Sequence, residues 1–115
     1  MAEYSTGTGH LRVKSTGPWN DDGAKQLLDE TKCEALKRDQ NRIFFDFSCW
    51  TQPESEMTRF RAGEYLAKVL PKPFKIAAFT GRSSITKFGE DVAVNRGANF
   101  RVFTDEQTAI EWLME

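Results

Sequence analysis

Gly81, Arg82, Ser83 and Ser84 carry the residue types in this chain that are best suited to hold a ligand. They stand between an apolar run and a helical pattern, where a tight turn exposes backbone N–H groups. Those groups, two hydroxyls and a guanidinium could together bind an anion. The commoner interpretation is a polar turn with a serine cap and a solvated arginine. Neither the Walker pattern nor GxGxxG is present, so a nucleotide motif is not indicated.

Arg59 and Arg61 are two further cations expected near a strand-to-helix junction. With Arg82 they are our candidates for holding an anion. The alternative is that these arginines bind no ligand, because exposed arginines are common and most belong to solvated helix faces. The sequence therefore predicts a candidate anion site without establishing one.

Catalytic chemistry has few candidates in the sequence. His10 is the only histidine, and its neighbours predict a solvent-facing position, so we expect no metal site. Cys33 and Cys49 do not form a CxxC pair, and we interpret them as free thiols in a reducing compartment. A dyad of Cys49 and His10 has no support from their spacing. Asp46 interrupts an apolar run, and bonding to nearby backbone is a commoner role for it than catalysis. We therefore predict no enzyme.

Length and composition limit the remaining classes of function. The 115 residues are long enough for one domain, 1–115, with its own core. The net charge of −1, with mixed signs along the chain, argues against a nucleic-acid partner. No apolar run is long enough to span a membrane and no signal peptide opens the chain, so we expect a cytoplasmic protein without membrane insertion. No cofactor motif is evident.

The secondary structure is organised around residues 74–99. Residues 74–80 are almost continuously apolar, which is typical of a strand covered on both faces. Ile85, Phe88 and Val92 follow at helical spacing, and Gly97 fits the left-handed residue that ends a helix.

The other elements follow from the same patterns. We predict an edge strand in 1–6, a turn at 6–9 and a half-buried strand at 10–14 that buries Leu11 and Val13. A helix should reach about Arg38, followed by a strand over 42–48 and a helix that ends before PKP. The buried stripes of these two helices are expected at Ala24, Leu27, Leu28, Thr31 and Ala35, and at Met57, Phe60, Gly63, Leu66, Ala67 and Leu70. A strand at 100–103 precedes the last helix, for which Thr104 and Gln107 should form a capping box.

This element order is β-β-α-β-α-β-α-β-α. Strands that alternate with helices of ten or more residues require a largely parallel sheet. We therefore predict an α/β fold with a mixed, mostly parallel five-stranded sheet, helices packed on it, and an antiparallel edge from the initial hairpin.

At this point the chain resembles the STAS-domain superfamily, in particular the SpoIIAA-like group of short bacterial proteins, which share a likeness with CRAL-TRIO lipid-binding domains. The resemblance covers nearly the whole chain. It rests on FFDFS at 44–48, GEYLAKVLPKPFKIAAF at 63–79 and NRGANFRVFTDEQTAIEWL at 95–113. These segments are structural signatures, so they support fold better than function.

The resemblance implies two properties. STAS antagonists carry a phosphorylatable serine in an Asp-Ser-Ser-Gly type motif after the third strand. The matching segment here, 48–58, lacks the motif and offers Ser48 and Ser55, with Thr51 and Thr58, as its hydroxyls. The second implied property is binding of a lipid or other apolar ligand in a cavity.

Two functions remain open. The first is a non-enzymatic regulatory or protein-interaction module, which we expect to be a homodimer, with Trp19, Trp50 and Trp112 as candidate interface anchors. The second is a small-ligand binder. Its ligand would be either an anion near 81–84 or an apolar molecule between helices and sheet, near Trp50, Phe60 and Phe88. Apolar residues at helical spacing are, however, usually core.

Overall fold

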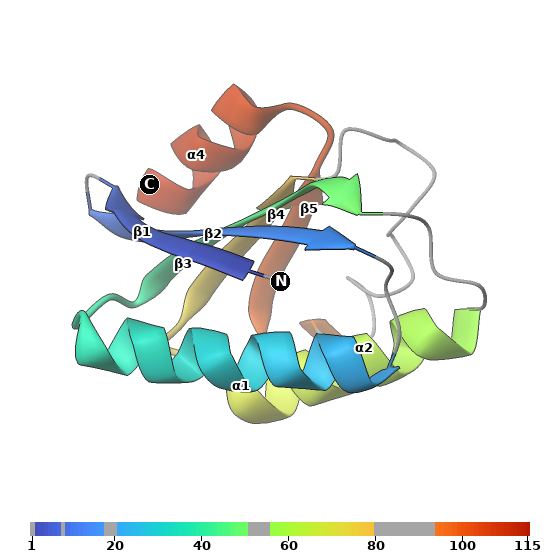
Figure 1. The fold of residues 1–115 in the computed structure, drawn as a ribbon. Coiled ribbons are helices and arrows are strands. Elements are labelled where there is room, and N and C mark those ends of the chain that lie inside the picture. The colour runs from blue at the N-terminus through green and yellow to red at the C-terminus, as the bar shows by residue number, and fades with distance from the viewer. Residues whose placement is uncertain (1, 8, 18–20, 51–55, 80–93) are drawn as a thin grey trace.

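The computed structural model describes residues 2–7, 9–17, 21–50, 56–79 and 94–115 (Figure 1). Within them the chain forms β1 (Ala2–Gly7), β2 (His10–Gly17), α1 (Asp21–Lys37), β3 (Arg42–Trp50), α2 (Glu56–Val69), β4 (Lys75–Phe79), β5 (Asn99–Phe103) and α4 (Glu106–Met114). Most of the helix expected at 85–96 lies outside the described residues. Gly97, at its expected end, has the positive φ of +99° that we predicted.

All five strands belong to one sheet, in the order β1-β2-β3-β4-β5. β1 and β2 form an antiparallel hairpin. β2, β3, β4 and β5 are parallel, with Leu11 opposite Ile43 and Ile43 opposite Ile76. The predicted mixed, mostly parallel sheet with an antiparallel edge is confirmed.

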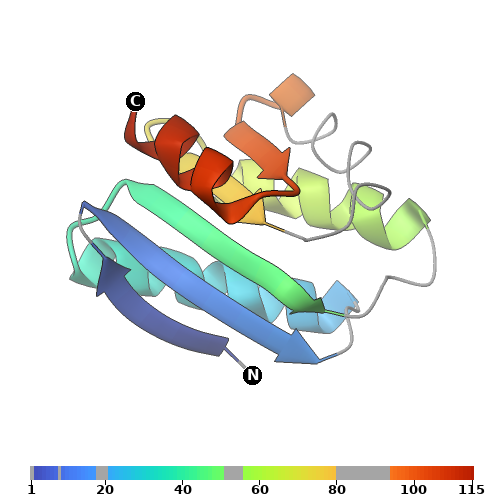
Figure 2. The same cartoon turned by 90° about the horizontal axis from the view of Figure 1, so that it is seen from above.

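Helices cover both faces of the sheet, but unequally. α1 and α2 lie side by side under one face, and α4 lies on the other (Figures 1 and 2). This arrangement follows from handedness, because right-handed crossovers between strands that advance in one direction put their helices on the same face. α4 follows β5 and makes no crossover, so it is free to cover the opposite face. It packs mainly on β3, β4 and β5.

The larger core lies between the sheet and the pair α1 and α2. Leu11 and Val13 are fully buried in it, as their alternation predicted. The predicted inner stripe of α1 is buried at every position, and so are the described positions of the α2 stripe: Ala24, Leu27, Leu28, Thr31, Ala35, Gly63, Leu66, Ala67 and Leu70. A second, smaller cluster under α4 contains Phe44, Ala77, Ala109 and Leu113.

Two sequence predictions are wrong. His10 is only 8% exposed, whereas we expected it to face solvent. Its ring packs edge-on to Phe44, with centroids 6.5 Å apart, and lies over Gly7, where an added Cβ would come within 2.8 Å of the imidazole. The alternation of β2 placed His10 on the correct side of the strand, but could not show that distant residues cover that side.

The cap of α4 is the second error. Asp105, not Thr104, is the N-cap residue, and its Oδ2 accepts from the N–H of Thr108 at 2.8 Å and from the Thr108 hydroxyl at 2.7 Å. These hydrogen bonds lower the pKa of Asp105. A carboxylate is a stronger acceptor than a hydroxyl and also interacts favourably with the positive end of the helix dipole, which explains why the cap moves one residue onward.

Truncation of Leu113 tests how much the packing of α4 on the sheet contributes to stability. Its side chain is fully buried in the smaller core. We expect Leu113→Ala to lower the free energy of unfolding by about 2–5 kcal/mol, because the truncation removes apolar contact and leaves a cavity. Urea denaturation followed by circular dichroism measures the change. The control is Glu111→Ala, an exposed position on the same helix. Equal stability of the two variants would contradict this packing.

Tyr4 joins the edge strand β1 to α1, since its hydroxyl donates to Glu30 Oε1 at 3.3 Å. Burial, assisted by the charge of Glu30, raises its pKa from 10 to about 12. The folded state thus favours the neutral phenol. The resulting stabilisation is fully present below pH 10 and is lost as the pH rises towards 12.

Tyrosinate absorbance can follow this ionisation. The chain has two tyrosines, so Tyr65→Phe leaves Tyr4 alone. We expect half-ionisation near pH 12 in the folded protein and near the ordinary value in urea. Ionisation of folded Tyr4 at the ordinary value would show that the β1–α1 contact does not bury the phenol.

Candidate functional site

The first predicted anion site lies largely outside the described residues. Arg82, Ser83, Ser84 and Ser55 are not described, and for Arg59 in α2 and Trp50 in β3 only the backbone is. An anion bound near residues 81–84 therefore remains a prediction, and so does an apolar ligand near Trp50. The described part of the chain instead presents two groups of interacting side chains, one on each face of the sheet.

The end of β3 contains an irregularity that explains Asp46. Lys14 lies opposite Asp46, but Thr16 lies opposite Cys49, so β3 has one residue more than β2 over this stretch. Such a bulge leaves a backbone group without a partner in the ladder. Asp46 Oδ1 accepts from the N–H of Ser48 at 3.0 Å and from its hydroxyl at 2.6 Å. The predicted bonding of Asp46 to nearby backbone is confirmed.

Around Asp46 lies what we call the Arg12 cluster: Arg12, Phe44, Asp46 and Glu106. Arg12 Nη2 is 2.9 Å from Glu106 Oε1 and 3.9 Å from Asp46 Oδ2. The guanidinium carbon stands 4.8 Å from the centre of the Phe44 ring. One arginine therefore links β2, β3 and the first turn of α4 through charge and stacking. Its chemistry is charge-assisted hydrogen bonding that holds α4 against the sheet.

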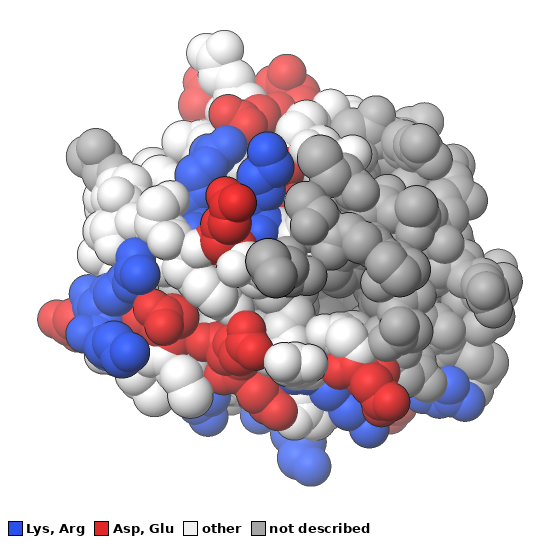
Figure 3. Space-filling model, viewed as in Figure 1, with Lys and Arg blue, Asp and Glu red and all other residues white. Residues whose placement is uncertain are grey.

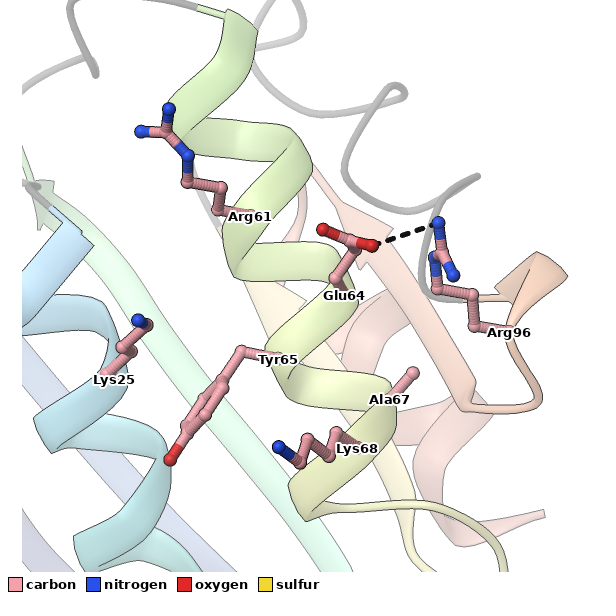
Figure 4. A pocket seen from close by; sticks show the side chains of 7 residues that line it. All are labelled: Lys25, Arg61, Glu64, Tyr65, Ala67, Lys68 and Arg96. Carbon is pink, nitrogen blue, oxygen red and sulfur yellow. Dashed lines mark ion pairs between the residues drawn. The ribbon is translucent and has the colours of Figure 1, made fainter.

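The second group lines an open hollow that we call the α1–α2 cleft (Figure 4). Its volume is about 500 Å³, and its lining residues are Lys25, Arg61, Glu64, Tyr65, Ala67, Lys68 and Arg96. Arg61 is one of the cations that the sequence singled out for anion binding. The structure places it with three further cations, from α1, from α2 and from the turn before β5.

The α2 wall of the cleft follows from helix geometry. Arg61, Glu64, Tyr65 and Lys68 are spaced i, i+3, i+4 and i+7, which puts them on one stripe of the helix. This stripe borders the buried one that contains Leu66 and Leu70. Sequence reasoning treated it mainly as a solvated face. The spacing was the available signal, but only the packing of α1 beside α2 makes the stripe a wall.

Tyr65 forms the contact between the two helices. Its hydroxyl donates to Asp29 Oδ1 at 2.7 Å, and this bond raises the pKa of Tyr65. Lys25 Nζ stands 5.8 Å from the centre of the Tyr65 ring. On the side of α2 away from α1, Arg96 Nη2 lies 3.0 Å from Glu64 Oε2 (Figure 4). Glu64, the one carboxylate among the described lining residues, is thus already paired with a cation of the lining.

Asp46 offers a test of its structural role. We expect Asp46→Ala to lower the free energy of unfolding by about 1–3 kcal/mol, because the N–H of Ser48 loses its acceptor. Asp46→Asn keeps an oxygen acceptor at this position and should cost less. Denaturation curves of both variants give the comparison. If Asp46→Ala is as stable as the parent protein, the carboxylate does not support the bulge.

Two properties of the described residues are relevant to the class of protein. In the ranges that the structure describes, no three or more His, Cys, Asp or Glu side chains gather in a way that could hold a metal ion. Among the same residues, no helix is long and apolar enough to cross a membrane.

Comparison with known proteins identifies the fold. No family model and no curated protein matches the sequence. Among solved structures, the chain is similar to that of the anti-sigma factor antagonist SpoIIAA in its unphosphorylated form. The TM-score is 0.59 at 10% sequence identity, and the match covers 99% of this chain and 96% of that one. The fold expected from the resemblance is confirmed: this chain has the SpoIIAA-like α/β fold.

Proposed function

We propose that this chain is a non-enzymatic regulatory module that acts by binding a protein partner, with a second copy of itself as the first candidate. The observation that carries the proposal is the structural match to an anti-sigma factor antagonist along nearly the full length of both chains. A fold alone does not determine function, so the proposal also needs a surface suited to a partner.

Such a surface lies on the side of the sheet that carries α4. Among the described residues, α4 packs mainly on β3, β4 and β5, and Glu3, Ser5 and Lys14 on the same face of β1 and β2 are exposed. Glu3, Ser5, Arg12 and Lys14 lie there, and we call these four residues the open strip. Glu3 pairs across the hairpin with Lys14, and Ser5 pairs with Arg12. Figure 3 shows that acidic and basic side chains are interspersed on the side of the molecule seen in Figure 1.

Mixed charge makes the open strip suitable for self-association. In a two-fold symmetric dimer the same patch meets itself, so a patch that carries both signs can complement its own copy. β1 is also the edge strand of the sheet, and in the described part of the chain its outer edge pairs with no other strand. Edge strands readily accept a further strand from another chain. Both features support a dimer built around β1.

Native mass spectrometry and sedimentation velocity test this proposal. We expect a dimer. We expect Lys14→Glu to weaken it by roughly tenfold or more, because a glutamate would repel the acidic group of the second copy that the lysine attracts. Lys72→Glu changes the same charge at an exposed position between α2 and β4 and serves as the control. A protein that stays monomeric, or that loses its dimer equally in both variants, would contradict self-association through the open strip.

A further inference from the structure

We propose that the α1–α2 cleft binds a small ligand with two or more anionic groups, of the chemical class of oligophosphates. The cleft lies on the face of the sheet that α1 and α2 cover, opposite to the open strip (Figures 1 and 4). The two proposals therefore concern different surfaces and can fail independently.

The charge of the lining differs from that of the chain. Among the described lining residues, four carry a positive charge, Lys25, Arg61, Lys68 and Arg96, and Glu64 carries a negative charge. These described residues together carry a net charge of +3, in a chain whose net charge is −1. Cations grouped around one hollow reinforce one another's field, and this raises the local concentration of anions.

The spacing of the cations indicates a ligand with more than one charged group. Arg61 and Lys68 lie seven residues apart on one stripe of α2, which separates their attachment points by roughly 10 Å along the helix axis. Lys25 faces this stripe from α1, and Arg96 approaches from the other side of α2 (Figure 4). Cations attached this far apart can each contact a different group of a ligand made of linked phosphates.

The size and chemistry of the hollow suit a small oligophosphate. Its volume of about 500 Å³ is within the range of small-molecule sites. Arginine presents a planar fork of donors that matches phosphate oxygens. Because Lys25, Arg61, Lys68 and Arg96 are exposed, binding should weaken markedly as salt is added.

Isothermal titration with inorganic tripolyphosphate at low salt is the test. We expect the parent protein to bind it, and the double variant Arg61→Ala with Lys68→Ala to bind at least ~10-fold more weakly, since two charge-assisted contacts are lost. Both side chains are exposed, so the fold should survive, which circular dichroism verifies. The matched control, Lys37→Ala with Arg101→Ala, removes one lysine and one arginine outside the cleft and should bind like the parent.

A second variant tests the same site by gain of affinity. Glu64→Gln removes the carboxylate that pairs with Arg96, so tripolyphosphate should bind roughly threefold or more tightly. Glu111 is an exposed acid in α4, outside the cleft, and Glu111→Gln is the control, for which we expect no change of this size. Amide shifts of Lys25 and Tyr65 on titration would place the ligand between the helices.

Three outcomes would overturn the proposal. The first is no binding of tripolyphosphate by the parent protein. The second is an equal loss of affinity in the cleft variant and its matched control, which would assign the binding to general surface charge. The third is tighter binding of a polyglutamate peptide than of tripolyphosphate, which would assign the cleft to an acidic protein partner.

Discussion

The burial of β3 on both faces is the constraint on which the rest of this structure depends. Ile43 and Phe45 point into the core under α1 and α2, Phe44 points into the cluster under α4, and all three are fully buried. Burying such a side chain contributes about 1.5–3 kcal/mol. β3 therefore requires neighbouring strands on both edges and helices on both faces.

Near its carboxyl end the same strand carries a buried carboxylate, Asp46. Asp46 is 7% exposed, and a carboxylate so placed needs hydrogen bonds and a nearby opposite charge. Ser48 supplies the hydrogen bonds and Arg12 the charge. Arg12 also binds Glu106 in α4. The arginine that provides the opposite charge for Asp46 therefore also helps to position the last helix. The polar contacts of this face thus depend on the apolar packing beneath them.

The sequence was sufficient to predict the elements that depend on local patterns. The apolar run at 42–48 predicted β3, and the alternation of Leu11 and Val13 predicted which side of β2 is buried. The same alternation failed for His10, because it could not show that Phe44, from β3, packs against the imidazole ring. The prediction of the α4 cap failed for a local reason. Thr104 and Asp105 are adjacent acceptors, and the stronger one, the Asp105 carboxylate, is the N-cap.

The candidate site was only partly predictable. The spacing of Arg61 and Lys68 was a signal that they share a stripe, but our sequence analysis interpreted these residues mainly as a solvated face. Lys25 and Arg96 come from segments distant in sequence. Their convergence depends on how α1 packs beside α2, which no local pattern contains. The likeness to SpoIIAA at 10% identity supports the same conclusion, because a fold can persist on the pattern of apolar and polar positions while individual side chains differ.

The unbroken strand order has a consequence for how the chain folds. Each strand pairs with its neighbour in sequence, so no strand has to insert between two strands that have already paired. The β1–β2 hairpin closes the shortest loop of the sheet, and each later pairing closes only one crossover. Assembly can therefore proceed from the hairpin towards β5 by successive addition. For a largely parallel sheet this keeps contacts short in sequence, and short-range contacts are associated with faster folding.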